Sequence, residues 1–267
     1  MGKCWYACLL PVARRRFLSA ASLVATILAA SQTTACAQQS AFGDAPEQQH
    51  QPSQGKVTNG DVGDLSQRAK AARLQEAYEW LMQGYAYAQA GNLPAAIEAY
   101  NHAISLSPSY LHAWLFRGKA HATLGDLDHA LADYGHALQL QPGNTEVLKQ
   151  RAVLYHNAMQ YDLAIDDYHD VLAAEPGNTN TLMKRGLAYL MLDSYDLALA
   201  DFDRILAQDP GNATLAAEAT ARRGDCFRKM GDNVRATAAY ESALALDPGN
   251  SVALNGQIIM LGDGIGR

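Results

Sequence analysis

Histidine is the residue type in this sequence whose number and crowding most clearly suggest chemistry. Seven of the eight histidines lie between His102 and His169, and neutral imidazole is a common ligand of zinc. A zinc site needs three or four ligand atoms within about 2.0–2.3 Å of the metal, and two histidines four residues apart on a helix commonly supply two of them. No two histidines here have that spacing, and His102 and His136 are 34 residues apart. The spacing predicts surface or packing histidines, with no metal site and no cofactor.

The sequence also lacks the common arrangements of catalytic groups. It has no Ser/His/Asp set in a recognisable context, no glycine-rich phosphate loop ending in Lys and Ser or Thr, and no isolated pair of carboxylates. Cys226 is the only cysteine beyond residue 36, and no catalytic partner lies near it in the sequence. Such a cysteine is typical of a buried apolar filler. We therefore expect that the protein is not an enzyme.

The composition predicts a folded, mainly helical protein with an acidic body. Of the 267 residues, 49% are hydrophobic and 18% are charged, and abundant alanine with sparse proline favours helices. The net charge is −6, but residues 1–37 carry four basic and no acidic side chains. The remainder therefore has 17 basic and 27 acidic side chains, a net charge of −10. This balance argues against nucleic acid and anionic membrane surfaces as partners.

The prolines divide most of the chain into repeats. Pro108, Pro142, Pro176 and Pro210 are each 34 residues apart, and Pro248 follows after 38. Counting back from each proline gives five repeats in one frame: 77–110, 111–144, 145–178, 179–212 and 217–250.

The last four repeats end in Pro-Gly-Asn, a triplet that predicts a turn between helices. In the first copy, Pro142 cannot supply the N–H that a continuing helix needs. We expect Gly143 to adopt the left-handed backbone of a helix exit, and Asn144 or Thr145 to cap the next helix.

Three positions of the frame hold side chains of nearly constant size. Position 8 is small, as Gly84, Gly118, Ala152, Gly186 and Gly224. Position 20 is always alanine, as Ala96, Ala130, Ala164, Ala198 and Ala236. Position 24 is aromatic, as Tyr100, Tyr134, Tyr168, Phe202 and Tyr240. Small residues let two helices approach closely, and larger ones would overpack the contact at a cost of about 1–3 kcal/mol.

This frame resembles the tetratricopeptide repeat family, whose pattern is W-x2-L-G-x2-Y…A-x3-F…P over 34 residues. The first repeat reads Trp80-x2-Gln83-Gly84-x2-Tyr87, and then Ala96-x3-Tyr100 and Pro108. The resemblance implies an all-α fold, a right-handed superhelical solenoid of five helix pairs, because no single repeat buries its apolar face alone. It also implies a protein or peptide partner.

Two irregularities lie at the C-terminal end. The fifth repeat arrives four residues late, so we expect its first helix to start one turn early, about 6 Å longer. After Pro248, residues 251–261 predict a final capping helix without a partner helix. That helix is apolar for a solvent-facing cap, so it offers a surface for self-association.

Charged residues recur at two further positions. Arginine occupies position 7, usually apolar in the family, as Arg117, Arg151, Arg185 and Arg223. Aspartate occupies position 23 in the middle repeats, as Asp133, Asp167 and Asp201. Partly buried charges are normally paired. Pairing within a repeat and pairing with the next repeat both satisfy three arginines, so the pattern leaves both open.

The resemblance places a binding groove on positions 2, 5, 9 and 12 of each first helix. The candidate groove residues are Tyr78, Leu81, Tyr85, His112, Leu115, Lys119, Lys149, Val153 and Met183. The Lys/Asn/Arg clamp of the chaperone-tail-binding members is missing, because Leu81 and Tyr85 stand where its first residues would be. We expect a groove that is apolar at its N-terminal end and polar at its C-terminal end. The alternative is that the helix from about residue 66, or the segment before it, covers the apolar end.

Residues 1–37 are typical of an export signal. Three consecutive arginines precede the apolar run FLSAASLVATILAAS, which is short and rich in Ala and Ser for a membrane span. Ala35 and Ala37 fit a signal-peptidase site with cleavage after Ala37. The stretch RRRFL also resembles the twin-arginine motif, with an ordinary secretory signal as the alternative.

Cys36 offers a lipoprotein alternative, with acylation of this cysteine, although Thr33 stands where such signals usually have Leu. Residues 38–63 are rich in Gln, Gly, Pro and Ser and predict a flexible linker. Asp64 or Ser66 would then cap the first helix of a repeat domain spanning 64–261. We expect a periplasmic or secreted scaffold of the bacterial envelope, or alternatively a membrane-anchored lipoprotein, touching the membrane only through a lipid or an uncleaved signal.

Overall fold

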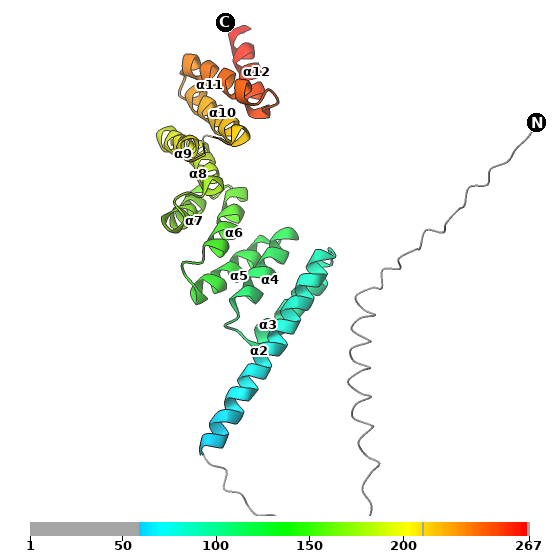
Figure 1. The fold of residues 1–267 in the computed structure, drawn as a ribbon. Helices are drawn as coiled ribbons and strands as arrows, with labels where there is room; N and C mark the ends of the chain where they lie inside the picture. Colours follow the sequence, from blue (N-terminus) through cyan, green and yellow to red (C-terminus); the bar gives the residue numbers. More distant parts are fainter. Residues whose placement is uncertain (1–58, 210, 266–267) are drawn as a thin grey trace, which may run out of the picture. The chain divides into compact units, whose positions relative to one another are not determined.

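The structure is a computed structural model that describes residues 59–209 and 211–265. Within these ranges it consists of helices without a strand (Figure 1). The helices are α2 (Asn59–Gln89), α3 (Leu93–Leu106), α4 (Leu111–Thr123), α5 (Leu127–Leu140), α6 (Thr145–Asn157), α7 (Tyr161–Ala174), α8 (Thr179–Met191), α9 (Tyr195–Gln208), α10 (Ala213–Lys229), α11 (Asn233–Leu246) and α12 (Ser251–Ile265). None of these described helices is both long enough and apolar enough to cross a membrane. The predicted signal, the acylation at Cys36 and the linker up to residue 58 lie outside the described residues.

The helices pack in consecutive pairs. The closest partners are α2 with α3, α4 with α5, α6 with α7, α8 with α9, and α10 with α11, and each pair also packs against the next one along the chain. Helix α12 packs against both helices of the last pair. This arrangement confirms the predicted all-α solenoid of five helix pairs followed by a single helix.

The left-handed backbone lies inside each helix pair, and not at the Pro-Gly-Asn turns between pairs. Position 15 has a positive φ in every repeat, from 56° to 81°, at Gly91, Gly125, Met159, Asp193 and Gly231. The predicted left-handed conformation of Gly143 is therefore wrong. The chain can leave helix α5 through an ordinary turn because proline already ends that helix.

Asparagine is the cap after each Pro-Gly-Asn turn. The side chain of Asn144 accepts a hydrogen bond of 3.0 Å from the backbone N–H of Val147, while Thr145 is already the first residue of α6. Asn178, Asn212 and Asn250 cap the helices that follow them in the same way. These caps satisfy backbone donors that would otherwise lack a partner at each helix start.

Three helix ends can be compared with the boundaries predicted from the sequence. Helix α2 begins at Asn59, so the prediction of a cap at Asp64 or Ser66 was too late, and residues 59–63 belong to the helix. Helix α12 continues to Ile265, beyond the predicted end at 261. Helix α10 begins at Ala213, one turn before the fifth frame, as the late proline predicts.

Glycine at position 8 is explained by the aromatic ring at position 24 of the same repeat. A Cβ added to Gly118 would lie 2.7 Å from Cε1 of Tyr134, and one added to Gly186 would lie 2.6 Å from Cε1 of Phe202. Such separations are far shorter than van der Waals contact, so a side chain there would force the ring to move. The close approach predicted from the small residues is present.

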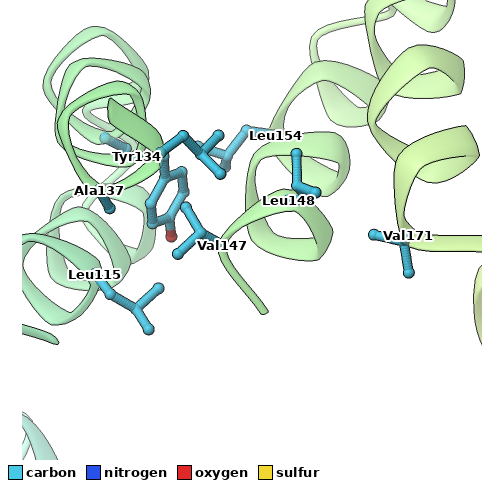
Figure 2. Close-up of a cluster of buried hydrophobic side chains, with 9 residues drawn as sticks. Leu115, Tyr134, Ala137, Val147, Leu148, Leu154 and Val171 are labelled. Carbon is cyan, nitrogen blue, oxygen red and sulfur yellow. The ribbon is translucent and has the colours of Figure 1, made fainter. Parts of the chain in front are cut away.

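The core runs along the chain as a series of clusters and not as one central mass. Figure 2 shows one of them, in which Leu115, Tyr134 and Val147 bring together α4, α5 and α6. Tyr134 is 1% exposed and Val147 is fully buried. Four of the five clusters among the described residues join one helix pair to the next, as expected where no repeat buries its apolar face alone, and the fifth lies within the pair α6 and α7.

Candidate functional site

The arginines at position 7 pair mainly within their own repeat. Arg117 with Asp133, Arg151 with Asp167, and Arg185 with Asp201 each form two hydrogen bonds of 2.6–2.9 Å between guanidinium and carboxylate. The aspartate side chains are only 3–5% exposed. Of the two schemes that the sequence leaves open, these three pairs follow the first.

Two of the position-7 arginines also reach position 25 of the preceding repeat. Arg117 donates to Asn101. The Nε atom of Arg223 lies 2.9 Å from Oδ1 of Asp203, which is ion-pair distance, although the direction of its N–H does not make a hydrogen bond. The fifth repeat has Ala239 at position 23, so its arginine uses the neighbouring repeat instead. These charges tie neighbouring helices together.

The predicted groove residues divide into exposed and buried ones. Tyr78 and Tyr85 are 47% and 44% exposed. Leu81 and Leu115 are only 4% and 3% exposed, so their assignment to an accessible groove is wrong. Both belong to core clusters instead. Met183 is partly buried and packs against the cluster formed by α7–α10.

A first hollow of about 350 Å³ lies between α2 and α4, and it is mainly aromatic and apolar. The ring centroids of Tyr85 and Tyr100 lie 6.0 and 6.1 Å from that of Phe116, and the ring of His112 lies 6.2 Å from Phe116 on the same helix. Lys119 lines one edge. This hollow suits an apolar or aromatic side chain.

A second hollow of about 400 Å³ lies between α4 and α6. Lys119, Gln150 and Val153 are among its lining residues, and Tyr134 of α5 also contributes to the lining. Nζ of Lys119 is 2.8 Å from the carboxylate of Glu146 on α6, so this lysine carries a bridging ion pair. The hollow is therefore mixed in character.

A third hollow of about 400 Å³ lies between α6 and α8, and it is polar. Gln150 and Asn180 offer amide groups, and Lys149 and Lys184 offer positive charge. Nζ of Lys149 lies 3.4 Å from the carboxylate of Glu175, whereas no ion pair is found for Lys184 within the described part of the chain. Tyr168 lines this hollow as Tyr100 and Tyr134 line the other two.

The tyrosines at position 24 remain neutral hydroxyl groups. Burial raises the pKa of Tyr100 to about 12, with a smaller contribution from Tyr85. Burial also raises the pKa values of Tyr134 and Tyr168, with a further contribution from the aspartate next to each in sequence. At neutral pH each phenol keeps its proton and can donate or accept a hydrogen bond.

Neighbouring hollows share lining residues and so adjoin one another, and together we call the three hollows the trough. Lys119 lines the first and second hollows, and Gln150 and Val153 line the second and third. The trough thus runs along α2, α4, α6 and α8, with the aromatic hollow at one end and the polar hollow at the other. His112 borders it through the ring of Phe116.

Sequence reasoning missed position 6, the source of Phe116, Gln150 and Lys184 in the trough. Position 13 also contributes, through Gln89, Thr123 and Asn157. Positions 2, 6, 9 and 13 follow the spacing of one helix face, whereas position 5 points into the core in the first two repeats. The polar type of Gln150 and Lys184 was a signal that could have identified position 6.

The N-terminal part of α2 does not cover the trough. Residues 66–76 are exposed throughout, and the hollow that they help to line is formed with the end of α3 and the turn after it, outside the trough. The covering-helix alternative is therefore wrong for the described residues, since a covering helix would bury one of its faces. The segment before residue 59 lies outside them.

The turn between α4 and α5 brings three potential metal ligands together. One ligand atom from each of His121, Asp126 and His129 lies within 4.8 Å of the others. The expectation that spacing keeps the histidines apart is wrong for this pair, because the turn reverses the chain between them. The motif HxxxH describes one helix and misses a site built across a turn.

Comparison with known proteins identifies relatives through family and fold. The family model for the tetratricopeptide repeat matches residues 81–145 and 151–213. A search of curated proteins found no match.

Several solved structures resemble the fold. A tetratricopeptide repeat protein from Parabacteroides merdae has a TM-score of 0.65 at 24% identity, over 70% of this chain and 74% of its own. YrrB, described as a TPR protein with an unusual peptide-binding site, has a TM-score of 0.61 at 17% identity, over 73% and 96% of the two chains. MamA from Desulfovibrio magneticus has a TM-score of 0.60 at 18% identity, over 66% and 97%.

Proposed function

Because the chain belongs to the tetratricopeptide repeat family, we propose that it is a non-enzymatic scaffold that binds an extended peptide segment of a protein partner in the trough. The observation that carries this proposal is the row of three adjoining hollows, in which the first and second share Lys119 and the second and third share Gln150 and Val153. A row of hollows along four helices fits a chain segment better than it fits a compact small molecule. YrrB, which is similar in fold, is described as having a peptide-binding site.

The lining chemistry favours a peptide with an apolar side chain at one end and an acidic group towards the other. The aromatic hollow formed with Tyr85 and Phe116 accepts the apolar side chain. Gln150 and Asn180 supply amide donors and acceptors for a peptide backbone. Lys184, which has no ion pair among the described residues, attracts the acidic group.

Selection from a library of short random peptides on the purified full chain tests this proposal. We expect enriched peptides to combine an apolar anchor with an acidic residue several positions away. Fluorescence anisotropy then measures the affinity of one selected peptide for Tyr85→Ala and Lys184→Ala. Each change is expected to weaken binding about 10-fold, because residues that anchor an interface typically contribute more than about 1 kcal/mol.

Leu197→Ala provides the matched control, since Leu197 is an exposed apolar residue on α9 and does not line the trough. It should leave the affinity unchanged. Leu115→Ala is unsuitable as a groove variant because it removes a core side chain. If Leu197→Ala weakens binding as much as the two trough variants do, or if those variants bind normally, the peptide uses another surface.

The location in the bacterial envelope rests on the sequence of residues 1–37 and remains a proposal. Cleavage after Ala37 would release the protein into the periplasm or outside the cell, whereas acylation at Cys36 would anchor it as a lipoprotein. Mass spectrometry of the mature N-terminus distinguishes the two. A mature chain that starts at residue 38 without lipid refutes the lipoprotein alternative, and a chain that retains residue 1 refutes cleavage.

A further inference from the structure

The turn between α4 and α5 places two imidazole rings around one carboxylate. Nδ1 of His121 lies 3.2 Å from Oδ2 of Asp126, and Nδ1 of His129 lies 2.8 Å from Oδ1. The two rings are stacked, with centroids 5.1 Å apart and planes inclined by 21°. All three side chains therefore direct ligand atoms into one small volume.

Backbone hydrogen bonds hold this arrangement in place. The N–H of Asp126 donates to the carbonyl oxygen of His121 at 2.9 Å, and Gly125 makes this possible with a φ of 80°. Asp126 is also the N-cap of α5 and accepts from the backbone N–H of His129 at 3.4 Å. The separation of the three ligand residues is thus set by the turn itself and does not depend on long flexible side chains.

We propose that His121, Asp126 and His129 form a binding site for a divalent transition metal ion, with zinc as the best match. A tetrahedral ion with bonds of about 2.0–2.1 Å holds its ligand atoms about 3.4 Å apart. The two nitrogen–oxygen distances are 3.2 and 2.8 Å, and all three ligand atoms lie within 4.8 Å of one another. Two imidazole nitrogens and one carboxylate oxygen are typical zinc ligands and leave one position open for a further ligand.

An unsatisfied atom at the site supports the metal. Nδ1 of His121 is buried and has no hydrogen-bond partner, even though Asp126 is close by. Buried polar atoms are normally satisfied, and an exception calls for an explanation. A metal ion between this nitrogen and the carboxylate would satisfy both atoms at once.

The fifth repeat shows what the same turn looks like without the ligand set. Its positions 11, 16 and 19 hold Phe227, Asp232 and Arg235. Arg235 pairs with Asp232 at 2.6 Å, and its guanidinium lies 4.5 Å from the centre of the Phe227 ring. A charge pair stacked on a ring is therefore a structural feature that needs no metal.

The second repeat differs from the fifth because its ring and its basic group are both imidazoles. The three positions hold Tyr87, Asn92 and Ala95 in the first repeat, Tyr155, Gln160 and Leu163 in the third, and Tyr189, Ser194 and Leu197 in the fourth. Only the second repeat combines three residues that can all ligate a metal. Packing of the turn does not require histidine at these positions, because the other repeats form the same turn with different residues.

Metal binding at this site must displace protons. A metal on Nδ1 requires a neutral ring whose remaining proton sits on Nε2, so any proton on Nδ1 is released to solvent. The negative charges of Asp128 and Asp133 also act on His129, and they would favour a bound metal cation as they favour the protonated ring. Affinity should fall as the pH is lowered, because protons then compete with the metal for the ring nitrogens.

Isothermal titration calorimetry of the metal-free full chain with Zn²⁺ tests the proposal. The decisive variant, His121→Phe with His129→Arg, installs the pattern of the fifth repeat and so preserves the packing of the turn. We expect it to bind one equivalent of Zn²⁺ fewer than the unaltered chain. It should also lose the rise in melting temperature that Zn²⁺ causes, since a ligand that binds only the folded state stabilises it.

His169→Ala is the control, because His169 is exposed, its Nδ1 lies 3.7 Å from the carboxylate of Asp170, and it belongs to no group of three potential ligands among the described residues. It should bind as many equivalents as the unaltered chain. Co²⁺ bound to the unaltered chain should show the absorption of a tetrahedral ion, and the double variant should lose it. Equal stoichiometry in the unaltered chain and a folded double variant, as judged by circular dichroism, would overturn the proposal. So would an absence of binding.

Discussion

The pair formed by Arg185 and Asp201 makes a quantitative prediction about stability. It is the most buried of the three pairs, with side chains 12% and 3% exposed and two hydrogen bonds of 2.8 and 2.6 Å. The first repeat already uses Gln83 and Ala99 at the same two positions. The changes Arg185→Gln and Asp201→Ala, singly and together, therefore convert the fourth repeat to an arrangement that the fold accepts.

The two single variants should be worse than the double one. Arg185→Gln leaves a carboxylate unpaired at 3% exposure, and we expect a loss of about 4 kcal/mol in the free energy of unfolding. Asp201→Ala leaves a guanidinium that is more exposed and lies 5.7 Å from the ring of Tyr189, so the loss should be about 3 kcal/mol. The double variant leaves no unpaired charge and should lose only about 2 kcal/mol.

Urea unfolding followed by far-ultraviolet circular dichroism measures these losses. The loss in the free energy of unfolding for the double variant should be about 5 kcal/mol smaller than the sum of the two single losses, which is a large coupling energy for one pair. Asp203→Ala is the control, because its pair with Arg223 is 58% exposed on the aspartate side and should contribute no more than about 1 kcal/mol. Additive losses in the Arg185 and Asp201 cycle would refute the idea that the buried pair acts as a unit.

Four other predictions follow from burial and close contact. Gly186→Val should destabilise by about 1–3 kcal/mol in the same assay, because its Cβ would lie 2.6 Å from the Phe202 ring; an unchanged midpoint would show that the ring moves freely. Leu115→Ala should cost about 2–5 kcal/mol, and a loss below 1 kcal/mol would mean that the site is not core. Burial raises the pKa of the Cys226 thiol to about 12, so iodoacetamide should modify it at pH 8 only after unfolding. If α12 mediates self-association, Ile258→Asp, at a residue 65% exposed, should lower the mass found by light scattering; a monomer before the change contradicts the sequence prediction.

Much of the repeat architecture could be predicted because it depends on short-range spacing. The 34-residue interval of the prolines and the recurrence of glycine at position 8 define helix pairs before any contact is known. The ring of Tyr134 beside Gly118 then shows the contact that the spacing implies. Sequence patterns predict the backbone conformation poorly where a turn can form in more than one way. Gly143 is an example, because its turn does not need the left-handed backbone.

The candidate site was only partly predictable because it depends on which side of each helix faces the next one. Tyr85, Lys119 and Val153 line the trough, and their role in binding remains a proposal. Leu81 and Leu115 were assigned to that surface by the family pattern, but both are core residues. A single helical turn separates a groove position from a core position, and only packing against neighbouring helices decides between them.

The sequence by itself determined the class of fold, since periodic small, aromatic and proline residues act within one repeat and need no distant partner. It also determined that charges at positions 7 and 23 must be paired, because burial of an unpaired charge is costly. The tertiary structure decided which charges pair, which side chains line the trough, and that His121 and His129 meet across a turn. The physical reason is that these properties depend on distances between atoms on different helices, and residue spacing along the chain does not specify them.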